Sequence, residues 1–126
     1  DNNRLSGDVI AVQDGLADLR LDDGSLVRGR LGPAAPQTGE RADLYIRPES
    51  LVLGGDALRP EYSTLRASVT TTLFDGANSR LEADSAGQTL YARLPQDGSA
   101  PRLREGASIQ LAWDPMLARV FVPGAA

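Results

Sequence analysis

The sequence contains no histidine, no cysteine and no lysine, and each absence excludes a class of chemistry. Without histidine, the commonest general base near neutral pH is missing and a Ser-His-Asp triad cannot be built. Without cysteine there is no thiolate nucleophile, no disulfide and no cysteine-based zinc site, and the redox compartment cannot be read. Without lysine, a nucleotide-hydrolysing loop of the G-x-x-x-x-G-K-[ST] type is excluded as well. We therefore expect a protein that is not an enzyme and that holds no cofactor and no metal.

Long apolar runs are also missing, since none approaches the ~20 residues that span a bilayer. The chain does not begin with Met or with a basic-then-apolar signal pattern, so we expect a fragment of a longer protein. All 13 basic residues are arginine, and they are interspersed with 17 acidic residues for a net charge of −4. Nucleic-acid-binding surfaces are usually basic, because counterion release drives their affinity. The charge therefore argues against a nucleic-acid partner.

Most of the chain alternates between apolar and polar residues, and glycine or proline interrupts the alternation at short intervals. Such alternation places apolar side chains on one face of a strand and polar ones on the other. Leu19 and Leu21, for example, share one face, whereas Asp18 and Arg20 share the other. The segment Asp22-Asp23-Gly24-Ser25 then predicts a hairpin turn. The sequence predicts an all-β protein with strands over residues 9–12, 16–21, 26–31, 42–46, 50–53, 67–74, 79–83, 88–94, 108–113 and 118–122.

The two halves of the chain repeat the same punctuation, which indicates an internal duplication, although glycine turns are common in all β proteins. We expect two domains, residues 1–57 and 58–126, joined by the Gly- and Pro-containing connector 54–60. Each half has about five strands, which suits a small barrel of the oligonucleotide/oligosaccharide-binding (OB) type. The predicted fold is two tandem OB-like five-stranded barrels. The matching markers are Asp14-Gly15 with Asp75-Gly76, Gly24 with Gly87, Gly39 with Gly106, Leu44 with Leu111, Pro48 with Pro115, and Leu53 with Val120.

Arg47-Pro48-Glu49 follows an apolar strand and precedes Leu51-Val52-Leu53, and this element resembles the signature of the TOBE-type regulatory domain. That domain forms the C-terminal part of ATP-binding subunits in bacterial ABC importers. The resemblance is closest to the branch that serves polyamines, ferric iron, thiamine and related solutes. One departure is that Gln13-Asp14-Gly15 lacks the aromatic residue that Phe74 supplies in the second half. Other segments that resemble this domain bring the resemblance to nearly the whole chain: residues 3–9, 73–82, 88–95, 106–115 and 120–121.

The resemblance implies a fold of two OB-like TOBE barrels and a role beside the ATP site rather than within it. It implies that the domain helps two ATPase subunits to dimerise, so that one partner would be a second copy of itself. In some members the domain also binds a regulatory solute or a partner protein that throttles transport. The implied location is cytoplasmic, at the inner face of the cell membrane, with contact to the membrane only through the permease of the transporter.

Six residues are candidates for an interface or a ligand site: Arg47, Glu49, Phe74, Asn78, Arg80 and Trp113. Asn78 and Arg80 follow a turn, where the arginine fork could grip an anion or a partner carboxylate, the alternative being a surface arginine. Glu49 could pair with the neighbouring arginine, act across a dimer, or be simply solvated. Phe74 and the only tryptophan, Trp113, belong either to the core or to an interface, where tryptophan is enriched.

Three functions fit these observations, and we favour the first. The first is the regulatory and dimerising domain of an importer ATPase subunit for solutes such as polyamines or ferric iron. The second is a free-standing module in which duplicated barrels hold an oxyanion or another small solute between them, because a fold does not decide a function. The third is OB-type nucleic-acid binding, which stacks bases on aromatic side chains in a positive groove. Six aromatic residues and a negative net charge argue against this third function.

Overall fold

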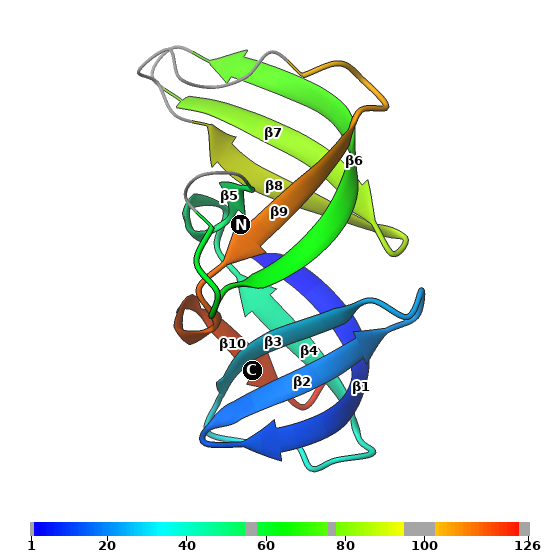
Figure 1. Ribbon diagram of the computed structural model, residues 1–126, viewed down its shortest axis with the longest axis vertical. Helices are drawn as coiled ribbons and strands as arrows, with labels where there is room; N and C mark the ends of the chain where they lie inside the picture. Colours follow the sequence, from blue (N-terminus) through cyan, green and yellow to red (C-terminus); the bar gives the residue numbers. More distant parts are fainter. Residues whose placement is uncertain (1, 55–57, 76–77, 95–102, 124–126) are drawn as a thin grey trace.

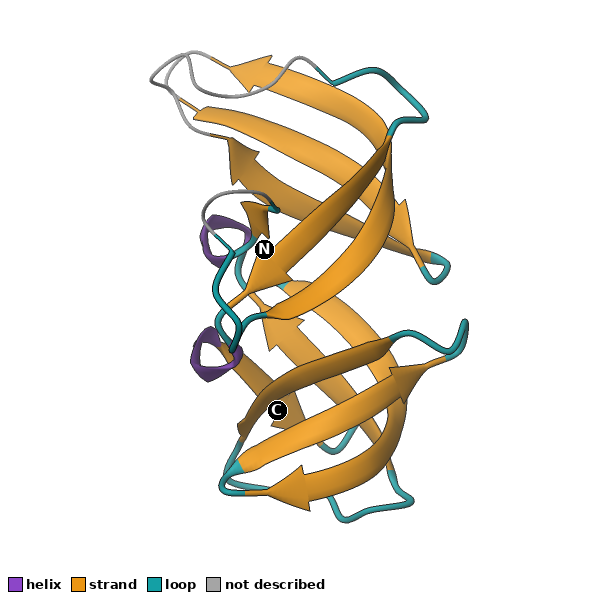
Figure 2. Ribbon diagram, in the orientation of Figure 1, coloured by secondary structure: helices purple, strands orange, loops and turns teal. Residues whose placement is uncertain are grey.

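The computed structural model of the chain describes residues 2–54, 58–75, 78–94 and 103–123, and for residues 74, 75 and 78 it describes the backbone alone. These residues form two β-rich lobes stacked along the long axis of the molecule (Figure 1). Two short 3-10 helices lie at the waist between the lobes (Figure 2). No helix in the described ranges is long and apolar enough to cross a membrane. The predicted all-β fold with two OB-like units is confirmed.

The first lobe is a closed five-stranded barrel with the strand order β1-β2-β3-β10-β4, in which β4 pairs again with β1. Neighbouring strands run antiparallel, except that β10 lies parallel to β3. Closure leaves the sheet without a free edge. The elements are β1 (Asn3–Gln13), β2 (Leu16–Leu21), β3 (Leu26–Leu31), β4 (Arg41–Ile46), the helix η1 (Pro48–Ser50) that follows β4, and β10 (Ala118–Phe121).

The second lobe is a five-stranded antiparallel sheet with the order β5-β9-β6-β7-β8. The sheet curls so that its last strand, β8, also contacts β5 and η1. This curl gives the second lobe the same barrel-like shape as the first. The elements are β5 (Val52–Leu53), β6 (Ser63–Asp75), β7 (Asn78–Ser85), β8 (Gln88–Leu94), β9 (Ser108–Trp113) and the helix η2 (Pro115–Leu117).

Each lobe takes one strand from the other half of the chain, as the colours of Figure 1 make visible. β5 follows η1 in the first half, but it pairs with β9 in the second lobe. β10 follows η2 in the second half, but it closes the first barrel between β3 and β4. The sheets therefore do not coincide with the expected domains 1–57 and 58–126. The reason is that Pro48 and Pro115 end the preceding strands, because proline has no N–H for the ladder, and the 3-10 turns then lead the chain across the waist.

The two lobes share one strand register, which supports the duplication. An irregularity in pairing after Val9 in β1 matches one after Val69 in β6. The amide of Gly39 donates to the Val9 carbonyl at 2.8 Å, and the amide of Gly106 donates to the Val69 carbonyl at 2.7 Å. Both glycines have positive φ, 94° and 85°, which glycine adopts without a steric penalty. Matching glycines in the sequence thus mark matching turns in the structure.

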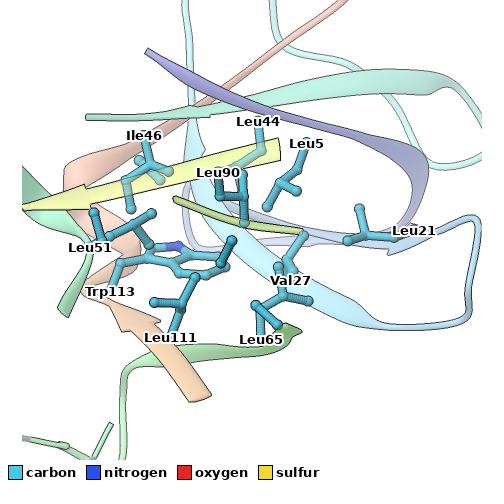
Figure 3. Packing of buried hydrophobic residues seen from close by; sticks show 14 of the residues in the cluster. Leu5, Leu21, Val27, Leu44, Ile46, Leu51, Leu65, Leu90, Leu111 and Trp113 are labelled. Atoms are coloured by element: carbon cyan, nitrogen blue, oxygen red, sulfur yellow. The ribbon is translucent and has the colours of Figure 1, made fainter. Parts of the chain in front are cut away.

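A single hydrophobic core runs through both lobes and across the waist. Trp113, at the end of β9, is 0% exposed, and its ring lies among side chains that include Leu51 and Leu111 (Figure 3). Its indole Nε1 donates a hydrogen bond to the carbonyl of Arg28, on β3 of the other lobe, at 3.0 Å. The amide of Arg28 donates to Ser63 Oγ at 3.0 Å. The side chain of Trp113 therefore joins the two lobes through a hydrogen bond.

A second pair of hydrogen bonds joins the lobes at the matching position. The side chain of Asn3 accepts from the Tyr91 amide at 2.8 Å and donates to the Tyr91 carbonyl at 2.7 Å. Asn3 opens β1 as Ser63 opens β6, so the two lobes satisfy the backbones of Tyr91 and Arg28 at equivalent places with different residues. Directional bonds as well as apolar burial therefore set the orientation of the lobes.

We expect Trp113→Phe to lower the free energy of unfolding by roughly 1–3 kcal/mol, because it leaves the Arg28 carbonyl without its donor in a partly buried place. Urea denaturation followed by circular dichroism measures the loss. Ile46→Val is the matched control, since Ile46 pairs with Asn3 as Trp113 pairs with Ser63, and it should cost roughly 0.5–1.5 kcal/mol. A loss clearly below about 1 kcal/mol for Trp113→Phe would contradict the role of the indole bond.

Candidate functional site

A surface pocket lies at the junction of the two lobes and takes its lining from both. Its volume is about 480 Å³, and small-molecule sites typically measure ~300–1,000 Å³. Part of the lining comes from the N-terminal segment and the β4–η1 connection, and the rest from β7 and β8. The lining residues are Asn2, Arg47, Pro48, Glu49, Ser79, Arg80 and Arg93. Three arginines from separate elements therefore meet around one hollow.

Arg47 reaches the pocket from the short connection between β4 and η1. It occupies the N-cap position of η1 in an extended conformation, and its side chain makes no capping hydrogen bond. At the same place before η2, Asp114 accepts a hydrogen bond from the Met116 amide at 3.0 Å. Short acceptors such as Asp are the favoured caps, so an arginine here gives no capping stabilisation. Because η1 contacts β8, Arg47 lies beside the second lobe although it belongs to the first half.

Arg80 and Arg93 stand directly opposite each other on the antiparallel strands β7 and β8. Like charges in such positions destabilise a sheet. The guanidinium carbon of Arg80 lies 4.9 Å from the centroid of the Tyr91 ring, which is a cation–π geometry. Both arginines are exposed, whereas the adjacent Ser79 is only 7% exposed. An anion between the two guanidinium groups would relieve their repulsion.

Elsewhere on the surface, two arginines form salt bridges with carboxylates. Arg28 contacts Asp18 at 2.6 Å, and this hydrogen bond and the carboxylate charge raise the pKa of Arg28. Arg41 contacts Asp22 at 3.0 Å, and the hydrogen bond from that carboxylate raises the pKa of Arg41. Within the part of the chain that the structure describes, no carboxylate forms a salt bridge with any of the three pocket arginines. Their charge is available to a ligand, with the exposed carboxylate of Glu49 nearby in the same lining.

This arrangement suits a small oxyanion better than a cation or an apolar molecule. Each guanidinium offers a planar fork of donors that matches pairs of oxygens on carboxylate-like or phosphate-like groups. Three arginines against one glutamate leave the lining with a positive balance. Among the described residues, no group of three or more His, Cys, Asp and Glu side chains could hold a metal ion.

The structure brings half of the sequence candidates together. Of the two alternatives for Trp113, the core is the one that the structure shows, because the side chain is completely buried between the lobes. Phe74 and Asn78 lie on β6 and β7, but their side chains are outside the described residues. Three candidates line the pocket: Arg47, Glu49 and Arg80.

Sequence reasoning missed Arg93, Ser79 and Asn2. A signal for Arg93 was present in the β7–β8 hairpin. Ala86 and Gly87 both have positive φ, 52° and 77°, as a two-residue type I′ turn requires. Counting back from that turn places residue 93 opposite residue 80. Ser79 and Asn2 carry no such signal, because their place in the pocket depends on how the lobes meet.

Comparison with known proteins identifies the type of domain. Residues 44–121, more than half of the chain, match a family model for the TOBE domain. Among solved structures, the cytoplasmic molybdate-binding protein ModG, with molybdate bound, matches with a TM-score of 0.80 and 17% sequence identity. The match covers 96% of this chain and 96% of that chain, and at this identity it shows the fold. No curated protein sequence matches the chain.

Proposed function

Because the chain belongs to the TOBE domain family, we propose that it is a module that binds a small oxyanion in the pocket between its lobes. The observation that carries this proposal is the meeting of Arg47, Arg80 and Arg93 around one hollow, without a salt-bridge partner among the described carboxylates. The family is one of non-catalytic binding modules, in agreement with the prediction that the chain is not an enzyme.

The comparisons favour the second hypothesis from the sequence over the first, because ModG, which shares the fold, binds molybdate. A tetrahedral oxyanion presents several acceptor oxygens to donors that arrive from different directions. A hydrogen bond to a charged group contributes about 1.5–3 kcal/mol, so three arginines supply roughly 4–9 kcal/mol before the costs of association.

Calorimetric titration of the chain with molybdate, sulfate and phosphate at low ionic strength should give a saturable signal for at least one of them. Arg80→Gln should weaken that binding by roughly 10- to 100-fold, because it removes one charge-assisted contact. The matched control is Arg20→Gln, on an exposed position of β2 in the other lobe, which should leave the affinity unchanged. Absence of binding for all three oxyanions, or equal losses in the two variants, would contradict the proposal.

We further propose that this module is the regulatory part of an importer ATPase subunit of the polyamine or ferric-iron type. The Arg47-Pro48-Glu49 element and the family support this setting. Its partners would be a second copy of the domain and, through the permease, the cytoplasmic face of the membrane. An open reading frame that encodes G-x-x-x-x-G-K-[ST] upstream of the Asp1 codon is the expected result. A start codon directly upstream would instead mean a free-standing module.

A further inference from the structure

The duplicated fold defines a counterpart of the arginine pocket on the other lobe. In the first lobe, Leu16 on β2 stands opposite Arg30 on β3, at the register where Arg80 stands opposite Arg93 in the second lobe. The helix η2 contacts β3 as η1 contacts β8. The counterpart therefore keeps one arginine of the opposed pair and has an apolar residue in place of the other.

The connection before η2 lacks the chemistry of the pocket as well. Asp114 occupies the position that Arg47 has before η1, and its carboxylate accepts a hydrogen bond from the Met116 amide. Met116 in turn replaces Glu49, and it is 53% exposed. The position before η1 thus brings the positive charge of Arg47 into the pocket. The matching position before η2 carries the negative charge of Asp114, which has a structural role.

The two places consequently offer an anion different amounts of positive charge. The lining of the pocket presents three guanidinium groups and one carboxylate to an oxyanion. In the counterpart, Arg30 has Arg119 beside it on β10 but no arginine opposite it on β2, and the position that matches Arg47 carries the carboxylate of Asp114, which repels an anion. The pocket and its counterpart therefore share the same strand register and differ in the charges of the residues at matching positions.

We propose that the duplicated chain binds one oxyanion rather than two, and that Leu16 and Asp114 disable the counterpart pocket. The inference rests on the proposed function of the arginine pocket. A duplication produces two equivalent lobes. In this chain, one of the two equivalent places binds the ligand, whereas the other has a structural role only. In the first lobe the neighbouring charges form an internal ion pair instead, Arg28 with Asp18 at 2.6 Å.

Calorimetric titration of the full chain with molybdate tests this by stoichiometry. The unmodified chain should bind one equivalent, and Arg80→Gln should remove most of the heat rather than half of it. Leu16→Arg combined with Asp114→Arg should raise the stoichiometry to two. The same two substitutions in an Arg80→Gln background should restore one site. Leu16→Arg alone is the matched control and should leave the stoichiometry at one, because Asp114 still repels the anion.

The outcomes separate the inference from the proposed function. Two equivalents bound by the unmodified chain, or half of the heat surviving in Arg80→Gln, would overturn the inference and leave the oxyanion function standing. A folded chain with both new arginines that gains no site would overturn the roles of Leu16 and Asp114. Absence of any molybdate heat in the unmodified chain would overturn both. If the doubly substituted chain does not fold, the stoichiometry of the unmodified chain decides alone.

Discussion

Truncation of the chain after Leu117 is expected to unfold the first lobe, although the strand that is lost belongs to the far end of the sequence. β10 lies between β3 and β4 and completes the closed barrel. Its Ala118 and Val120 are both 0% exposed. Each ladder hydrogen bond that is lost contributes about 0.5–1.5 kcal/mol, and a fully buried Val side chain roughly 1.5–3 kcal/mol. Summed over the strand, the loss approaches the whole stability of a domain, about 5–15 kcal/mol.

Amide hydrogen exchange measures this effect lobe by lobe. After truncation, the amides of β1 to β4 should exchange rapidly, whereas in the full chain they should be protected. Truncation after Pro123 is the matched control, because it keeps β10 and should leave the protection unchanged. If β1 to β4 stayed protected without β10, the first barrel would close by itself. The strand β10, which comes from the other half of the chain, would then not be essential to it.

Local alternation was sufficient to place most strands, because side chains that alternate in polarity fit only one face of a sheet. The start of β1 was missed, since the prediction began at Val9 and the strand begins at Asn3. Its inward positions there are Asn3, Leu5 and Gly7, and only one of them is a large apolar residue. A buried amide that bonds to the other lobe looks, in a sequence, like a solvent-exposed one. Four strands have the predicted bounds: 16–21, 26–31, 88–94 and 108–113.

The sequence could not predict that β5 pairs in the second lobe and that β10 pairs in the first. Both are short apolar segments after a proline turn, and either barrel offers such a segment the same apolar surface. Pairing within a half and pairing across halves therefore satisfy the same alternation. The choice depends on long-range packing at the waist, where Trp113 and Asn3 bond to the opposite lobe.

The pocket forms because β5 pairs in the second lobe. This long-range pairing explains why the sequence predicted only some of the residues that line the pocket. Because β5 enters the second lobe directly after η1, the chain must cross the waist at Arg47, and the crossing brings this residue to β8. Turn and motif chemistry indicated Arg47, Glu49 and Arg80 one by one. To predict that they lie around one pocket with Arg93, both the register of the β7–β8 hairpin and the pairing of β5 with the second lobe had to be known.

The substitution of both Arg47 and Arg80 by glutamine is expected to weaken oxyanion binding by at least about 100-fold, since each lost charge-assisted contact contributes about 1.5–3 kcal/mol. Arg47 belongs to the first half and Arg80 to the second lobe, so a bound anion would join the two. At a concentration of 100 times the dissociation constant, the ligand should stabilise the unmodified chain by about 2.7 kcal/mol. Thermal denaturation should then show a rise in Tm of roughly 10 °C, which the double variant should lack.

Glu49→Gln provides the control with the opposite sign, because it removes the carboxylate from the same lining without touching a donor. Its affinity for the oxyanion should increase, and the gain should shrink as added salt screens the charges. A pocket that merely tolerated anions at its surface would respond to net charge alone, so that Arg20→Gln would weaken binding as much as Arg47→Gln does. Equal effects of those two single substitutions would therefore show that the three arginines do not act as one site. A loss confined to the pocket, together with a gain for Glu49→Gln, requires that they do.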